Sequence, residues 1–307
     1  MGVLKISRLC SGAWFSKLSS PSTPSRPSQL SERELNPLAR TLLYAVLIAF
    51  AAMTIYPIFW VIISSFKTTQ AFQLNRLGLP SPWVVINYPQ AWTMGNFGVL
   101  FLNSLFYTGA ATLAVILGSL SAGFAFAKIP SRATPFLYGS FIVGLLLTIQ
   151  SIMVPLFLLI NAVGLYNTRL GVLIPYVGLC LPLGVYLCTE YIRSIPDSVI
   201  ESARIDGAGY LTIFFRIVAP MAKPVVATLA VLTIQHVWNE FMLINILVSR
   251  PSLKSLPVGI LMFSGALSTD YGKQFAALVI GMVPMIVFYL IFRNHIARGV
   301  AAGAIKG

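Results

Sequence analysis

Six stretches of this chain are apolar, almost free of charge and about twenty residues long or longer, which is the length that a helix needs to cross a bilayer. They cover residues 41–66, 100–127, 133–162, 171–189, 224–248 and 274–292. Glu240, in the fifth stretch, is the one Asp, Glu, Lys or Arg residue within them. Because a backbone in lipid must satisfy its hydrogen bonds within its own segment, the pattern predicts an all-α, polytopic membrane protein with six transmembrane helices.

Composition excludes several other classes of protein. Charged residues make up 9% of the 307 residues, against about 25% in a typical soluble domain. The three cysteines, Cys10, Cys180 and Cys188, have neither metal-site spacing nor the pattern of a disulfide framework. We therefore expect no metal site and no soluble enzyme.

Charge placement predicts how the chain crosses the membrane. The net charge of +13 would suit a nucleic-acid-binding protein, but most of the Lys and Arg residues lie in the N-terminal tail and in alternate loops. With the N-terminus inside, these residues gather on the cytoplasmic side, as the positive-inside rule requires. The prediction is a multi-pass protein of the plasma or bacterial inner membrane with both termini cytoplasmic, membrane lipid around it and no nucleic-acid partner.

The expected organisation has four parts. Residues 1–38 are basic and rich in Ser and Pro, which predicts a disordered cytoplasmic tail; a cleaved organelle-targeting peptide is the less favoured alternative. Residues 39–98 hold the first span and an outer loop, residues 99–293 form the remaining transmembrane core, and residues 294–307 form a cytoplasmic C-terminal tail.

A long inner loop, residues 190–223, separates the fourth and fifth spans. Ser194 is positioned to cap a helix that has Pro196 in its first turn, and Gly207 and Gly209 would end that helix. A second short helix is expected at about residues 210–218. Either the pair lies among the lipid headgroups, or the first helix docks in a groove of a soluble partner.

The loop resembles the EAA motif of permease subunits of bacterial ABC importers. That motif reads EAA, three residues, G, nine residues, I-x-LP, and this chain departs from it at two positions, Ser202 for Ala and Ala219 for Leu. Residues 201–208 are similar to the form found in carbohydrate-uptake permeases. The resemblance implies that ATPase coupling is carried by Glu201, Ser202, Ala203, Asp206, Gly207, Ile217 and Pro220.

The resemblance continues through most of the chain after Arg40, although it does not cover the tail. Further family-like stretches lie at residues 101–105, 164–168, 238–241, 256–259 and 298–307. The six-span permease of maltose systems is the most similar type. The resemblance therefore implies a type I ABC importer permease fold, with a cytoplasmic coupling helix between spans four and five.

No G-x-x-x-x-G-K-[ST] loop for phosphate binding occurs in the chain. The resemblance implies that ATP is bound by separate ABC subunits at the cytoplasmic face. It also implies a second permease subunit in a hetero-oligomer, and an extracytoplasmic solute-binding protein. The chain itself is then a transport subunit with no catalytic residues and no cofactor.

Polar residues within the spans are candidates for a solute pathway: Asn103, Gln150, Ser151, Gln235 and Asn239. Each is also explained by a hydrogen bond between helices, the commoner role of such residues. A sugar or oligosaccharide as solute follows from the resemblance alone, and a polyamine or a glycerophosphodiester remains open.

Two other classes of membrane protein are less favoured. An ion-coupled carrier needs ionisable groups inside the membrane, and these spans offer Glu240 and His236. His236 is more commonly a packed, hydrogen-bonded residue. A membrane-embedded enzyme needs a catalytic cluster, but His236 and His295 lie far apart in the sequence with no partner pattern.

Overall fold

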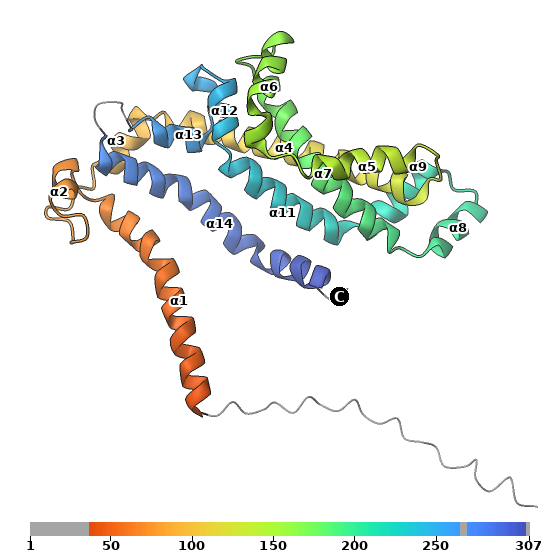
Figure 1. Ribbon diagram of the computed structural model, residues 1–307, viewed down its shortest axis with the longest axis horizontal. Helices are drawn as coiled ribbons and strands as arrows, with labels where there is room; N and C mark the ends of the chain where they lie inside the picture. The colour runs from red at the N-terminus through yellow and green to blue at the C-terminus, as the bar shows by residue number, and fades with distance from the viewer. Residues whose placement is uncertain (1–36, 265–268, 305–307) are drawn as a thin grey trace, which may run out of the picture. The chain divides into compact units, whose positions relative to one another are not determined.

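The computed structural model describes residues 37–264 and 269–304, in which the regular elements are helices (Figure 1). The expected tail, residues 1–38, and the end of the chain after residue 304 fall almost wholly outside this part. The longer helices are α1 (Pro37–Ser64), α4 (Phe97–Lys128), α5 (Thr134–Gly144), α6 (Ile149–Ala162), α7 (Arg169–Arg193), α11 (Lys223–Asn239) and α14 (Tyr271–Ala304). The short helices are α2 (Thr69–Leu74), α3 (Asn87–Met94), α8 (Asp197–Ile205), α9 (Tyr210–Ile213), α10 (Ala219–Met221), α12 (Met242–Leu247) and α13 (Leu256–Leu261).

Helix length and apolarity confirm the membrane-protein class. Within the described residues four helices are long and apolar enough to cross a membrane, and the number rises to six when two bent helix pairs count as one span each. The chain forms two units, Met1–Ile55 and Tyr56–Gly307. In the first unit, α1 is apolar on all sides and exposes large side chains such as Leu47, Phe50 and Met53, as expected of a helix that faces lipid.

The second unit has its core where α4, α7 and α11 pack together. Tyr107 on α4, Tyr176 on α7 and Leu229 on α11 are almost completely buried in one apolar cluster. At Gly123, α4 approaches α7 so closely that an added Cβ would lie 2.8 Å from Cys188 Cβ. Because close approach of backbones lets membrane helices gain van der Waals contact, this small residue stabilises the α4–α7 pair.

Replacing Gly123 with valine is therefore expected to lower the free energy of unfolding by about 1–3 kcal/mol, since the added methyl groups force α4 and α7 apart. Thermal unfolding in detergent measures this effect. Gly109→Val on the same helix is the matched control, because no heavy atom outside the helix lies within 4 Å of an added Cβ there. Equal destabilisation by both variants would contradict the packing role of Gly123.

The third span is not the continuous helix that the sequence predicts. It consists of α5 and α6, which meet at an angle of 107° across residues 145–148. Thr148 is extended, and its Oγ1 shares a 2.8 Å hydrogen bond with Ser151 Oγ in the first turn of α6. Apolarity was the basis of the prediction, and apolarity does not reveal a break that polar side chains stabilise. The segment Tyr210–Met221 of the inner loop meets Lys223–Asn239 at an angle of 72°. The fifth span, predicted over residues 224–248, is itself divided between α11 and α12.

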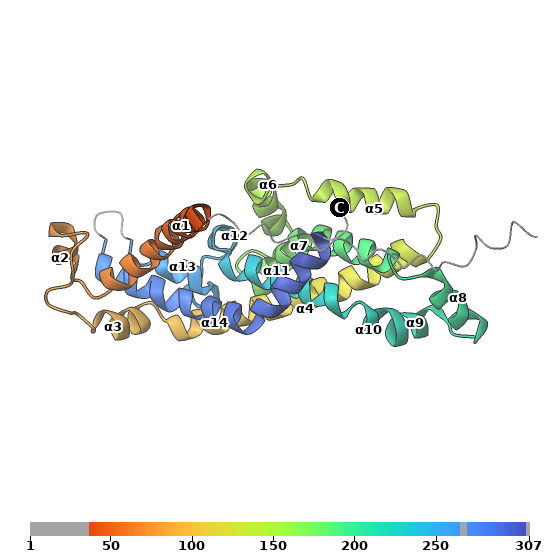
Figure 2. The same cartoon turned by 90° about the horizontal axis from the view of Figure 1, so that it is seen from below.

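Short elements gather at the two ends of the second unit. Helices α8 and α9 lie at one end, and α2, α3, α12 and α13 lie toward the other (Figures 1 and 2). We call these the α8 end and the α12 end. At the α12 end Lys67 is 1% exposed, and its Nζ donates to the backbone oxygens of Asn75 at 2.9 Å and Arg76 at 3.3 Å. Burial lowers the pKa of this Lys67 amine.

Candidate functional site

Helix α8 begins differently from the sequence prediction. Ser194 does not cap it, because Ser194 adopts a helical conformation at the end of α7 and its Oγ donates to Tyr191 O at 2.7 Å. Pro196 instead precedes the helix in an extended conformation, and Asp197 is the first helical residue. The Asp197 carboxylate accepts a 2.6 Å hydrogen bond from Nζ of Lys128, the last residue of α4.

The end of α8 confirms the predicted glycine turn. Gly207 has φ of +80°, the left-handed conformation that glycine adopts without steric cost. Gly207 N donates to Arg204 O at 3.0 Å, and Ala208 N donates to Ala203 O at 2.9 Å. The chain then enters α9, which continues as a π-helical turn over Phe214–Val218. The second helical segment covers the residues expected, 210–218, but does not end there, because it continues through Pro220 to Met221.

One side of the α8 loop is buried and the other is exposed. Ile200 and Ala203 join the apolar core of the second unit, together with Ile213 and Val218. The opposite side exposes most of the residues implicated in coupling, namely Glu201, Ser202, Asp206, Gly207 and Pro220, whereas Ile217 is half-buried. Ile205 is 86% exposed although it is fully apolar. In the segment that follows, Leu211 and Phe215 are also strongly exposed, at 75% and 65%.

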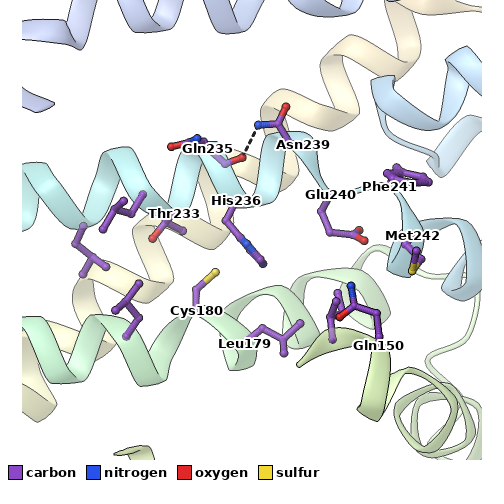
Figure 3. A pocket seen from close by; sticks show the side chains of 14 residues that line it. Gln150, Leu179, Cys180, Thr233, Gln235, His236, Asn239, Glu240, Phe241 and Met242 are labelled. Atoms are coloured by element: carbon purple, nitrogen blue, oxygen red, sulfur yellow. Dashed lines mark hydrogen bonds between the residues drawn. The ribbon is translucent and has the colours of Figure 1, made fainter. Parts of the chain in front are cut away.

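A cavity of about 680 Å³ lies beside α11 (Figure 3). Four helices contribute to its wall: α6, α7, α11 and α12. The polar groups on the wall are Gln150, Thr233, Gln235, His236, Asn239 and Glu240, and Cys180 and Phe241 are among the other lining residues. His236 is exposed on this wall, so the expectation that it is packed away from solvent is not supported.

Three of the five candidate pathway residues, Gln150, Gln235 and Asn239, line this cavity. Asn239 Nδ2 donates to the backbone oxygen of Gln235 at 2.9 Å, which leaves its Oδ1 available (Figure 3).

The other two candidate residues lie elsewhere. Asn103 is 4% exposed, and its Nδ2 donates to Ser252 O at 2.7 Å and to Lys254 O at 3.1 Å. Asn103 therefore connects α4 to the loop after α12 by hydrogen bonds. Such a structural role is the alternative to solute binding that the sequence left open. Ser151 contacts Thr148 at the break of the third span.

Glu240 is the cavity residue whose contacts the sequence did not reveal. It is 9% exposed, and its carboxylate accepts hydrogen bonds from Tyr176 Oη at 2.8 Å, Leu243 N at 2.6 Å and Ile244 N at 3.3 Å. It thus caps the N-terminus of α12, where a negative charge is favoured, and connects the α11–α12 break to α7. The sequence offered one signal for this role, because Glu240 is the only Asp, Glu, Lys or Arg residue in the predicted spans. Among the described residues, no group of three or more His, Cys, Asp or Glu side chains could hold a metal ion.

Comparison with known proteins adds three findings. Residues 114–302 match the family model described as the binding-protein-dependent transport system inner membrane component. The diacetylchitobiose uptake system permease protein NgcG of Streptomyces coelicolor is 33% identical, over 86% of this chain and 88% of its own. The multiple sugar-binding transport system permease protein MsmG of Streptococcus mutans is also 33% identical, over 86% and 96%.

The fold also has a counterpart among solved structures. A chain in the crystal structure of a bacterial ABC transporter involved in the import of the acidic polysaccharide alginate superposes with a TM-score of 0.71 and is 25% identical. The match covers 83% of this chain and 95% of that chain.

Proposed function

The chain belongs to the family of binding-protein-dependent transport system inner membrane components, and on that premise we propose that it is the permease subunit of an importer for a sugar or oligosaccharide. Membership makes it a multi-pass membrane protein that works with a solute-binding protein. Transport is powered by separate ATPase subunits, which bind the ATP, so this chain needs neither a catalytic residue nor a cofactor. A second permease subunit completes the pathway, and both termini lie in the cytoplasm.

The surface of α8 carries the proposal. Ile205 stands 86% exposed beside the left-handed turn at Gly207, on a helix whose opposite side is buried in the core. An apolar side chain of this kind on a short protruding helix fits a hydrophobic groove of a soluble protein. We assign that groove to the ATPase, because phosphate-binding loops are missing from this sequence and the energy must come from another subunit.

The cavity supports a hydroxylated solute. Its wall offers the amides of Gln150, Gln235 and Asn239 and the ring of Phe241, groups that hydrogen-bond to hydroxyls and stack on sugar rings. Two relatives are named for the uptake of diacetylchitobiose and of multiple sugars, which points in the same direction. A polyamine or a glycerophosphodiester is the alternative solute. An ion-coupled carrier is less favoured, since Glu240 uses its carboxylate to cap α12.

Transport then follows from the arrangement of the two sites. Closure of the ATPase on ATP moves α8, and the bundle that carries the cavity changes between inward-facing and outward-facing states. ATP can shift this equilibrium only because the ATPase contacts differ between the two states. The change is a rigid-body rearrangement of packed helices.

Ile205→Glu is expected to weaken ATPase binding by about 2 kcal/mol, about thirtyfold in affinity, because a charge replaces an apolar anchor at the centre of the contact. Affinity purification of the tagged chain from its native membrane in mild detergent measures this. The wild type should bring with it an ATPase, a second permease and a solute-binding protein. Ser198→Glu, which introduces the same charge at another exposed position of the same helix, is the matched control.

Two results would contradict the proposal. The first is a wild-type chain that brings no ATPase, and the second is an Ile205→Glu chain that brings as much as the wild type. The solute is tested on the recovered complex in lipid nanodiscs. ATP hydrolysis should rise when the binding protein is supplied with an oligosaccharide, and should stay unchanged with a polyamine or a glycerophosphodiester.

A further inference from the structure

The side chain of Lys128 connects the end of α4 to the corner between α7 and α8. Its Nζ donates to Ile195 O and to Asp197 Oδ1, each at 2.6 Å. Ile195 lies in the short link between the two helices, and Asp197 is the first residue of α8. One amine on α4 therefore binds both the link after α7 and the first residue of α8.

The burial of Lys128 is unusual for a basic residue at the end of a membrane helix. Such side chains normally extend into water, but the Lys128 side chain is 4% exposed, whereas that of Asp197 is 78% exposed. Burying an ammonium group is costly unless it is hydrogen-bonded, and the carbonyl of Ile195 and the carboxylate of Asp197 provide those bonds. The exposed Asp197 alone would make a weak ion pair, so the geometry matters here more than the strength of the pair.

Beside this contact, α8 is not tightly packed against the loop that follows α4. A cavity of about 540 Å³ lies between them and is lined by Asp197, Ile200, Glu201 and Arg204 from α8 and by residues 126–131, 134 and 135. Apolar contacts of Ile200 and Ala203 hold the rest of α8, and such contacts are not directional. Two charge-assisted hydrogen bonds, in contrast, fix both distance and direction.

We propose that Lys128 is a positioning residue for energy coupling, which makes α4 move together with α8. This inference rests on the proposed function, in which the ATPase moves α8. Helix α4 packs against both α7 and α11, and these two helices contribute much of the wall of the larger cavity. Displacement of α8 thus reaches the cavity through α4 as well as through the chain connection to α7.

The test uses the assembled importer with its ATPase and partner permease, purified into lipid nanodiscs. Cys180 reports the state of the larger cavity, because it lines that cavity and is 8% exposed. In a Cys10→Ser, Cys188→Ala background, a membrane-permeant maleimide labels Cys180 with and without ATP and vanadate. The ratio of the two labelling rates measures how strongly nucleotide controls the cavity.

Lys128→Met, which keeps the apolar stem and removes the amine, should reduce this nucleotide effect by about 2- to 30-fold. The ATPase should still co-purify, and the thermal unfolding temperature should stay close to that of the wild type. Lys128→Arg should restore the nucleotide effect in large part, because a guanidinium group can donate to both oxygens. Lys223→Met is the matched control: it removes the same charge from an exposed position at the end of the 190–223 loop.

The outcomes separate this inference from the proposed function. A full nucleotide effect in Lys128→Met would overturn the inference, and so would an equal loss in Lys223→Met or a loss of the ATPase from Lys128→Met. A wild-type complex without ATPase, or without any effect of nucleotide on Cys180, would overturn the proposed function instead.

Discussion

Gly207→Val is expected to abolish recovery of the ATPase with this chain while leaving insertion into the membrane intact. Gly207 has φ of +80°, and a side chain in the left-handed region costs about 1–2 kcal/mol, with β-branched residues the least tolerated. The turn also sets the direction in which α9 leaves α8, through the hydrogen bond from Ala208 N to Ala203 O. When the turn opens, Ile205 no longer stands in its present orientation, and the docking surface is lost. Affinity purification, together with the abundance of the chain in membranes, measures both effects.

Two variants control for this prediction. Gly207→Asn should retain most of the ATPase, because asparagine tolerates the left-handed conformation better than other residues with side chains. Gly209→Val places the same bulky side chain two residues later, where φ is −74° and no heavy atom lies within 4 Å of an added Cβ. If Gly209→Val were as damaging as Gly207→Val, bulk rather than backbone conformation would be the cause, and the prediction would be wrong.

Glu240→Leu is expected to lower the free energy of unfolding by about 3 kcal/mol or more, because each buried donor left without an acceptor costs about 1–3 kcal/mol. Three donors lose their acceptor: Tyr176 Oη, Leu243 N and Ile244 N. The N-terminus of α12 loses its cap at the same time, so the wall of the larger cavity should rearrange. Thermal unfolding in detergent measures the first effect, and maleimide labelling of Cys180 measures the second.

Conservative variants at the same contacts distinguish the hydrogen bonds from the charge. Glu240→Gln keeps one oxygen for Leu243 N and should lose much less stability than Glu240→Leu. Tyr176→Phe removes one hydrogen bond to a charged group and should cost about 1.5–3 kcal/mol. Should Glu240→Leu unfold at the wild-type temperature, the carboxylate would not be stabilising the α11–α12 break.

Features that depend on length and local chemistry could be predicted from the sequence. The apolar stretches located the spans because a bilayer imposes the same minimum length on every helix that crosses it. The turn at Gly207 was predicted because a helix that reverses direction there needs a left-handed residue, and glycine supplies it.

Features that depend on contacts between distant segments could not be predicted. Lys128 and Asp197 lie 69 positions apart, and Tyr176 and Glu240 lie 64 apart, so neither pair produces a local pattern. Ser194 is the converse case, in which a local pattern predicted a contact that the structure does not contain. Its sequence context suits a helix cap, but the end of α7 continues through it, and its hydroxyl bonds to Tyr191 O instead. The same limit applies to the candidate pathway residues. Segments distant in the sequence decide whether an amide lines the cavity, as at Gln150, or bonds to a loop, as at Asn103.

The contact between Tyr176 and Glu240 bears on how the protein is made. A carboxylate inside a bilayer is costly, by about 2.5–3.5 kcal/mol at the centre of a helix on insertion scales. Ribosomes release the chain from its N-terminus, so α7 with Tyr176 is synthesised before the segment that carries Glu240. The hydroxyl that stabilises the carboxylate is therefore already in place when that segment arrives. A circularly permuted chain that places the fifth span before α7 would reverse this order, and its fifth span would enter the membrane without the partner that its acid requires.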